Sequence, residues 1–191
     1  MTPILTIDAP HGIRLYLTAI DGEGASAPQN RREREKEAVL RLLTAVFGTS
    51  ATLRHKADGA PYIDDSAHPG IHISISHSTT HALLAVAHHV IGVDIDHQRP
   101  TLQRVATRFL SPAEQAFVGD DLPTLLKAWT AKEAIFKASA LHPADFAAQI
   151  DLSPILDAAT VTTSSATESH TIIHLPAPDA QSIAIAIPQQ P

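Results

Sequence analysis

The sequence predicts an α+β fold, because each half of the chain supplies a helix and several strands. The strictest strand-like alternation covers residues 71–76, where isoleucine and a polar residue take turns. The clearest helix covers residues 125–139, which are rich in Ala, Leu and Lys and contain neither Gly nor Pro. We therefore expect an N-terminal lobe over residues 1–98 and a C-terminal lobe over residues 99–191.

The N-terminal lobe is expected to combine one helix with several strands. Alternation predicts a strand over residues 14–20, and two Gly and one Pro predict a loop over residues 21–28. Asn30 is a suitable N-cap for a helix that runs to about Phe47 and ends at Gly48. Further strands are expected at residues 53–56, 71–76 and 82–87, the last two as a hairpin.

The later elements begin with a strand expected over residues 91–96. A helix over residues 102–109 follows, and a second helix starts at Ser111, because Ser-Pro-Ala-Glu is typical of a capped helix start. The helix over residues 125–139 comes after Pro123. Strand-like segments then occur at residues 146–152, 160–163, 170–175 and 182–187.

The composition limits the classes of protein to consider. The 191 residues are 44% hydrophobic, which is enough for a packed core, and include no Cys, which excludes disulfides and thiolate chemistry. The net charge of −6 argues against a general nucleic-acid binder. No apolar run reaches the roughly 20 residues that span a bilayer, and the N-terminus lacks the cationic region of a signal peptide. We expect a cytoplasmic protein without nucleic-acid or membrane partners, and a monomer.

Basic residues are distributed unevenly along this acidic chain. One cluster is interleaved with glutamates and is expected to be a solvated helix face. It comprises Arg31, Arg32, Arg34, Lys36 and Arg41. A second cluster is less compensated by acidic neighbours and suits a small anionic ligand or an acidic protein partner. It comprises Arg99, Arg104 and Arg108.

The helix over residues 125–139 carries an unusual stripe of side chains. Trp129, Glu133 and Lys137 are spaced i, i+4 and i+8, so they share one helix face. An aromatic ring, a carboxylate and an amine on one face indicate that Trp129 anchors the helix. Glu133 and Lys137 are then presented to something charged.

Asp94 and Asp96 form a candidate cation site on the strand over residues 91–96. They are two residues apart, so their carboxylates point to the same side, roughly 6–7 Å apart at the backbone. Mg²⁺ is typically held by one or two carboxylates together with water and substrate phosphates, and Glu133 could be a third ligand. Two solvated acids at an exposed strand end would explain the same spacing equally well.

His77 and Glu114 are candidates with strong structural alternatives. His77 follows a strand end beside Ser74 and Ser76, and could bind phosphate through charge-assisted hydrogen bonds. In a chain with 12 His, an ordinary turn histidine explains it as well. Glu114 completes the capping box that starts at Ser111, which accounts for this residue without an active site.

Other catalytic motifs have little support. A zinc site among His68, His72, His77 and His81 is conceivable, but the alternating strand separates these side chains and no Cys or tight His spacing supports it. The chain contains no P-loop, no glycine-rich dinucleotide fingerprint and no Gly-x-Ser-x-Gly motif.

Four segments, in their order and spacing, resemble the 4′-phosphopantetheinyl transferases of the longer, Sfp-like type. They are Ser74-Ile-Ser-His-Ser78, Gly92-Val-Asp-Ile-Asp96, Arg108-Phe-Leu-Ser-Pro-Ala-Glu114 and Trp129-Thr-Ala-Lys-Glu-Ala-Ile-Phe-Lys137. Lys56-Ala-Asp-Gly-Ala-Pro-Tyr62 is also similar to the Lys-x-x-Gly-x-Pro segment of that family. The Trp-x-x-Lys-Glu-Ala form resembles the subgroup that serves fatty-acid, polyketide and related carrier proteins.

The resemblance implies a pseudo-dimer of two similar α+β lobes with the active site between them. It implies an Mg²⁺-dependent enzyme that moves the phosphopantetheine arm of coenzyme A onto a serine of an acyl or peptidyl carrier protein. The by-product is adenosine 3′,5′-bisphosphate. A non-catalytic module that binds coenzyme A or a carrier protein is the alternative, and a His-rich metal hydrolase is a third possibility.

The resemblance also implies roles for individual residues. Asp94 and Glu133 resemble the principal Mg²⁺ ligands, whereas Asp96 stands where relatives of this type usually have a Glu ligand and could bind through water. Lys137 would stabilise charge on the phosphoryl oxygens, and Glu133 or a metal-bound water would take the serine proton. Glu114 resembles an acid near the metal.

The remaining roles concern coenzyme A and the carrier protein. Contacts to the phosphates and the adenosine end of coenzyme A are implied for Lys132, Lys137, Ser76, His77 and Lys56. Carrier proteins of this type are generally acidic around their serine, so the cluster Arg99, Arg104 and Arg108 is expected to steer them.

Overall fold

The computed structural model describes residues 2–20, 30–64 and 67–189 of the chain. Backbone contacts divide the chain into two compact units, Met1–Val90 and Ile91–Pro191. The predicted lobe boundary at residue 98 lies inside the second unit. The loop predicted over residues 21–28 lies outside the described residues.

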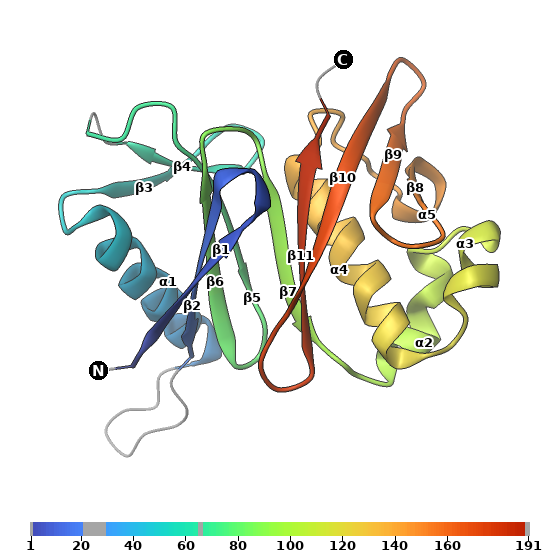
Figure 1. Ribbon diagram of the computed structural model, residues 1–191, viewed down its shortest axis with the longest axis horizontal. Helices are drawn as coiled ribbons and strands as arrows, with labels where there is room; N and C mark the ends of the chain where they lie inside the picture. The colour runs from blue at the N-terminus through green and yellow to red at the C-terminus, as the bar shows by residue number, and fades with distance from the viewer. Residues whose placement is uncertain (1, 21–29, 65–66, 190–191) are drawn as a thin grey trace. The chain divides into compact units, whose positions relative to one another are not determined.

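The first unit is an antiparallel sheet with helix α1, Arg31–Phe47, packed against it (Figure 1). The sheet has the strand order β1-β2-β6-β5, with β1 at Ile4–Ala9, β2 at Ile13–Ala19, β6 at His81–Ala87 and β5 at His72–His77. A separate two-stranded ribbon pairs β3, Thr52–His55, with β4, Pro61–Asp64. The predicted hairpin between the strands now labelled β5 and β6 is confirmed.

Helix α1 begins and ends at the residues that the capping signals predict. The Asn30 side chain accepts the Glu33 N–H, and the Glu33 carboxylate accepts the Asn30 N–H, so two donors at the helix start are satisfied. At the other end, Gly48 has a φ of 83°, a conformation that favours glycine, and its N–H donates to Thr44 O. The helix contributes to the core of this unit through Ala38, Leu42, Leu43 and Phe47.

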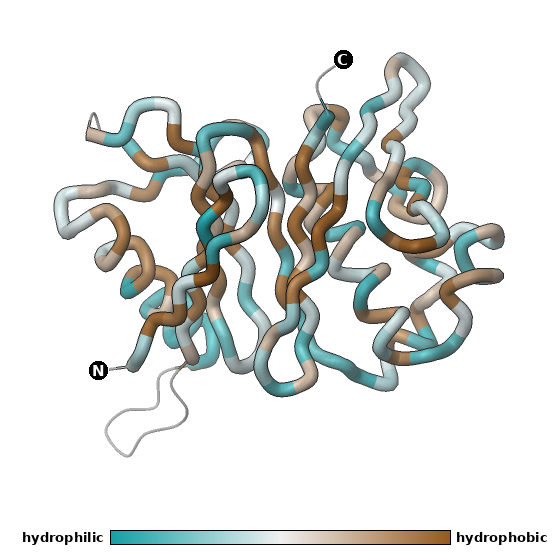
Figure 2. The backbone as a smooth tube through the Cα atoms, in the orientation of Figure 1, coloured by the Kyte–Doolittle hydropathy of each residue, from teal (hydrophilic) through white to brown (hydrophobic). Residues whose placement is uncertain are grey.

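The second unit is also an antiparallel sheet covered by a helix. Its strand order is β7-β11-β10-β9-β8, with β7 at Gly92–His97, β11 at Gln181–Pro188, β10 at Thr167–Pro176, β9 at Ala158–Thr162 and β8 at Ile150–Leu152. Helix α4, Leu122–Ala138, packs against β7, β11 and β10. Figure 2 shows hydrophobic residues gathered along β10 and β11, and both strands contribute to the core beneath α4.

Shorter helical segments complete the two units. They are the 3₁₀ turn η1 at Pro10–Gly12, α2 at Thr101–Val105, the 3₁₀ turn η2 at Ala106–Arg108, α3 at Pro112–Val118 and α5 at Phe146–Gln149. The capped start predicted at Ser111 is confirmed, since its side chain accepts the Glu114 N–H and Glu114 reaches back to the Ser111 N–H. No helix in the described parts of the chain is long and apolar enough to cross a membrane.

Two predicted segments differ from the structure. The helix expected over residues 102–109 is divided into α2 and η2, because Val105 leaves the helical backbone conformation with a ψ of 5°. The strand expected over residues 146–152 begins instead as helix α5, because the Asp145 carboxylate accepts the Ala148 N–H at 3.0 Å and caps a helical turn. Only the last part of that segment forms strand β8.

Three further features are not predicted by the sequence patterns. Strand β1 pairs with β2 along its whole length, and strand β4 pairs with β3. Helix α4 starts before Leu125, because Asp121 caps it and Pro123 fits the first turn, where its missing N–H has no helical partner to lose.

Strand β7 and helix α4 are so close at Gly92 that no side chain fits between them. A Cβ atom at this position would lie 1.9 Å from Ala134 O and 2.8 Å from Ala138 N. Because both neighbours are backbone atoms of a helix, they cannot rotate away as a flexible side chain would. The glycine therefore allows residues of α4 to lie next to the aspartates of β7.

Replacing Gly92 by Ala is expected to lower the free energy of unfolding by at least the about 1–3 kcal/mol typical of overpacking, because α4 must move away from β7. Gly59→Ala is a suitable control. A Cβ there meets nothing within 4 Å, although its φ of 88° is unfavourable for alanine. Urea denaturation measures both changes, and a loss below about 1 kcal/mol for Gly92→Ala would contradict the close contact.

Strand β10 carries two histidines in the second unit, of which His170 is buried and His174 is half-buried. Burial lowers the pKa of His170, against the opposing charge of Glu168, whose Oε2 lies 3.6 Å from His170 Nε2. Burial also lowers the pKa of His174, although its Nε2 hydrogen bond to Leu156 O, at 3.0 Å, acts in the other direction. Burial therefore disfavours the protonated form of both imidazoles.

Lowering the pH from about 7.5 to about 5.5 is expected to reduce the free energy of unfolding, because the unfolded chain takes up protons near the ordinary His pKa of about 6.5. The folded chain resists protonation at His170 and His174, so their contribution to the free energy of unfolding is complete above a pH of about 6.5. This contribution is lost as the pH falls from there toward the lower pKa that the two imidazoles have in the folded chain. Chemical denaturation at several pH values should show a flatter dependence for His170→Phe and an unchanged one for the exposed His55→Gln. If the free energy of unfolding of His170→Phe depends on pH as strongly as that of the wild type, this account is wrong.

Candidate functional site

Three carboxylates form the candidate site in the second unit, where β7 carries Asp94 and Asp96 and α4 carries Glu133. Burial raises the pKa of the Glu133 carboxyl, and the charges of Asp94 and Asp96 raise it further against the opposing charges of Lys137 and Arg99. With the described residues, the Glu133 carboxylate forms no hydrogen bond or ion pair. This half-buried carboxylate is therefore available to a ligand. A nearby cation would offset the repulsion that it experiences from Asp94 and Asp96.

Lys137 links the end of α4 to strand β7. Its Nζ donates to Asp94 Oδ1 at 2.8 Å and to Val93 O at 2.9 Å. The Lys137 side chain remains 27% exposed, whereas that of Asp94 is 10% exposed. The ammonium group is thus fixed beside the carboxylates while part of its surface stays open to an anion.

Asp96 is held by protein donors on both of its oxygens. Its Oδ2 accepts Trp129 Nε1–H at 3.0 Å and an N–H of Arg99. Its Oδ1 accepts the His97 backbone N–H at 2.8 Å, and His97 Nδ1 lies 3.3 Å from the same oxygen. This side chain therefore differs from Glu133, because three of its roughly four acceptor positions are already used.

Sequence patterns do not predict the two side chains that hold Asp96. The i, i+3 spacing of Asp96 and Arg99 is a local signal from which that pair could have been found. Trp129 lies 33 residues away in sequence, so only the fold reveals its hydrogen bond.

Aromatic packing holds Trp129 in place. The Trp129 and Phe109 rings meet edge to face with centroids 5.2 Å apart, and Phe146 lies 6.3 Å away on a tilted plane. Phe136, on the same helix, packs against Phe146 at 5.5 Å and is 44% exposed. Trp129 therefore anchors α4, as its place on the helix indicates.

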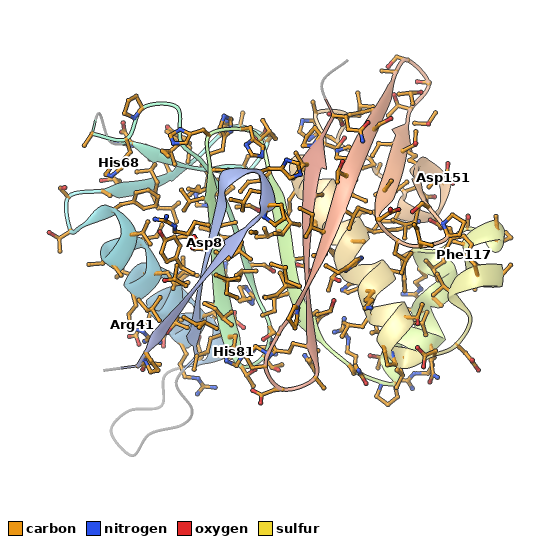
Figure 3. All side chains as sticks on the ribbon, viewed as in Figure 1. Asp8, Arg41, His68, His81, Phe117 and Asp151 are labelled. Carbon is orange, nitrogen blue, oxygen red and sulfur yellow. The ribbon has the colours of Figure 1, made fainter. Side chains whose placement is uncertain are left out.

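Glu114 and Lys132 form a buried ion pair. Lys132 Nζ donates to Glu114 Oε2 at 2.7 Å and also to the carbonyls of Phe146 and Ile150. Glu114 Oε1 accepts the Leu152 N–H at 2.8 Å. The Lys132 side chain is 0% exposed and the Glu114 side chain is 3% exposed. Asp151, labelled in Figure 3, lies between Ile150 and Leu152 and marks this region of β8.

The ion pair bears on the roles expected for both residues. Lys132 would have to leave its buried partners to reach the phosphates of a ligand, and Glu114 is occupied by Lys132, Ser111 and Leu152. Burial lowers the pKa of Lys132, and the hydrogen bond and charge of Glu114 oppose that change. In this structure both residues join α3, α4 and β8.

The carboxylates offer the donor type that a hard divalent cation requires. The described ranges contain no group of three or more His, Asp or Glu side chains arranged to hold a metal ion. Two carboxylates are nevertheless sufficient for Mg²⁺ when water and substrate phosphates complete its shell. Asp94 and Glu133 meet this requirement, because the charge of Asp94 raises the pKa of Glu133 and a shared cation would offset that repulsion.

The other predicted ligand contacts lie in the first unit. Lys56 is exposed at a turn closed by the Gly59 N–H, which donates to Lys56 O at 3.0 Å. Ser76 is buried in β5, and His77 at the end of that strand is 44% exposed, with Nδ1 3.6 Å from Glu35 Oε1. The partly exposed imidazole already has one acidic neighbour, so a bound phosphate would compete with Glu35 for it.

Comparisons with known proteins identify the family. The sequence model of the 4′-phosphopantetheinyl transferase superfamily matches residues 90–186, and the chain belongs to this superfamily. The chain is also similar to a 4′-phosphopantetheinyl transferase of Bacillus subtilis, with 34% identity over 84 residues. That alignment covers 41% of this chain and 37% of the relative, so the chain matches well under half of the relative's length. The family match includes β7, α4 and all the carboxylates of the candidate site.

Replacing Lys132 by Met is expected to lower the free energy of unfolding by about 3–5 kcal/mol, because Glu114 would remain buried without its partner. Lys127→Met on the same helix is the matched control. Lys127 is exposed, so its loss should change stability by less than about 0.5 kcal/mol. Denaturant titrations compare the two, and a stable Lys132→Met protein would contradict the structural role.

Proposed function

We propose that this protein transfers the 4′-phosphopantetheine arm of coenzyme A to a serine of an acyl or peptidyl carrier protein, with Mg²⁺ as cofactor. The observation that carries the proposal is the grouping of Asp94, Glu133 and Lys137 within the segment that matches the superfamily. We further propose the Sfp-like type with the Trp-x-x-Lys-Glu-Ala motif, a pseudo-dimeric fold, and adenosine 3′,5′-bisphosphate as by-product.

Two carboxylates are proposed to hold the cation. Asp94 and Glu133 carry hard oxygen donors, and their mutual repulsion favours a shared positive charge. When bound, Mg²⁺ would neutralise part of the charge of the diphosphate and make its phosphorus more electrophilic. Glu133, which has no other described partner, contributes an oxygen without first breaking an ion pair.

The reaction replaces one phosphorus–oxygen bond by another. The carrier serine oxygen bonds to the phosphorus that bears the pantetheine arm, and the bond from that phosphorus to the bridging diphosphate oxygen breaks. Lys137 stabilises negative charge on the phosphoryl oxygens, since its ammonium group is positioned by Asp94 and Val93. Phosphoryl transfer depends mainly on such positioning and charge neutralisation.

The serine proton needs an acceptor in the site. Glu133 or a water molecule bound to the cation is proposed to take this proton.

Coenzyme A and the carrier protein are proposed to use basic groups outside the carboxylates. Ser76, His77 and Lys56 are the proposed contacts to the nucleotide phosphates and the adenosine end. Arg104 and Arg108 are exposed, so they are proposed to attract the acidic surface of a carrier protein. Arg99 is partly engaged by Asp96 and contributes less to this surface.

Mass spectrometry of an apo-carrier protein incubated with coenzyme A and Mg²⁺ tests the proposal. We expect a mass increase equal to one phosphopantetheine arm. Coenzyme A binding without any mass increase, across several carriers, would favour the alternative of a non-catalytic binding module. Neither binding nor transfer would contradict both.

Glu133→Gln is expected to slow the transfer by about 10²–10⁴-fold, because it removes both the charge and the proton acceptor while keeping the shape of the side chain. Asp120→Asn is the matched control, since it neutralises an exposed acid that lies before α4. Single-turnover rates separate chemistry from product release. A near-normal rate for Glu133→Gln would remove this residue from the site.

A further inference from the structure

The two aspartates of β7 differ in what their carboxylates already bind. Asp96 accepts hydrogen bonds from Trp129 and Arg99 on one oxygen and from the His97 backbone on the other. A carboxylate offers about four acceptor positions, so little capacity remains for a cation. To bind a metal directly, Asp96 would have to give up charge-assisted hydrogen bonds, which are the stronger kind.

Asp96 is also connected to Glu133 through the helix. Its partner Trp129 lies one helical turn before Glu133, on the same face of α4. The indole is packed between Phe109 and Phe146, so its N–H has one favoured direction. The hydrogen bond from Trp129 to Asp96 therefore connects α4 to the end of β7 one helical turn before Glu133.

We propose that Asp96 is a positioning residue, which places Glu133 opposite Asp94 by holding Trp129, and that it does not bind the cation directly. This inference rests on the proposed function. It assigns the direct carboxylate ligands to Asp94 and Glu133 alone.

Metal binding distinguishes a positioning residue from a ligand. Mn²⁺ suits the same carboxylate donors as Mg²⁺, and the free ion can be measured by electron paramagnetic resonance in the presence of coenzyme A. Asp94→Asn should weaken Mn²⁺ binding by about tenfold or more, and Asp96→Ala by about tenfold, as for other residues that orient a metal ligand. Asp96→Asn should stay within about threefold of the wild type, because its amide oxygen can still accept the indole N–H.

The indole N–H provides a second measurement that does not depend on metal or activity. Trp129 is the only tryptophan in the chain, so its side-chain N–H gives a single nuclear magnetic resonance signal. Asp96→Ala should shift this signal and accelerate its exchange with solvent, and Asp96→Asn should largely restore both. Where Asp96→Ala does not fold, Trp129→Phe removes the same donor while keeping an aromatic ring, and it should weaken Mn²⁺ binding in the same way. Lys127→Ala on the exposed side of α4 should leave both measurements unchanged.

Three results would overturn the inference. If Asp96→Asn weakens Mn²⁺ binding as much as Asp94→Asn does, Asp96 is a ligand. If neither Asp96→Ala nor Trp129→Phe changes Mn²⁺ binding, the contact does not position Glu133. In both cases the wild-type chain can still bind Mn²⁺ and transfer the arm, so the proposed function stands. If the wild type binds no Mn²⁺ and transfers nothing, the proposed function fails and the inference fails with it.

Discussion

The close approach of helix α4 to strand β7 at Gly92 is the constraint on which the candidate site depends. A side chain at this position would meet the helix backbone at 1.9 Å, so the two elements touch backbone to backbone. Side chains that leave β7 and α4 beyond this contact are therefore short of space and lie close together. Asp94 reaches Lys137, and Asp96 reaches Trp129, without any loop having to close over them.

The two lysines that flank Glu133 on α4 show how one helix separates structural from reactive groups. Lys132 faces the interior, where Glu114 and two carbonyls surround its ammonium group, and it is fully buried. Lys137 lies one turn beyond Glu133 and is partly exposed beside Asp94. Residues four apart share a helix face, whereas adjacent residues are rotated by about 100°. The Lys-Glu pair of the motif thus divides into a buried lysine that is paired with Glu114 and a half-buried glutamate that belongs to the proposed site.

Local signals account for what the sequence could predict. The caps at Asn30 and Ser111 depend on residues three positions away, and the helical spacing of Glu133 and Lys137 places them together. The burial of Lys132 could not be read from its neighbours, because its partners come from α3, α5 and β8. The strand-like sequence pattern also did not reveal helix α5, because a single cap at Asp145 determines the conformation of this segment. The hydrogen bond between Trp129 and Asp96 also depends on tertiary packing, because the two residues are far apart in the sequence.

The hydrogen bonds of Lys137 to Asp94 and Val93 affect the entropy change when an anion binds. A free lysine side chain samples many rotamers, and ordering one on binding typically costs about 0.5–1.5 kcal/mol. Here Asp94 and Val93 already hold the ammonium group before any phosphate arrives. A diphosphate would therefore meet a charge that has lost most of its conformational freedom during folding. The entropy of ordering this side chain is borne by the stability of the protein rather than by its affinity for the ligand.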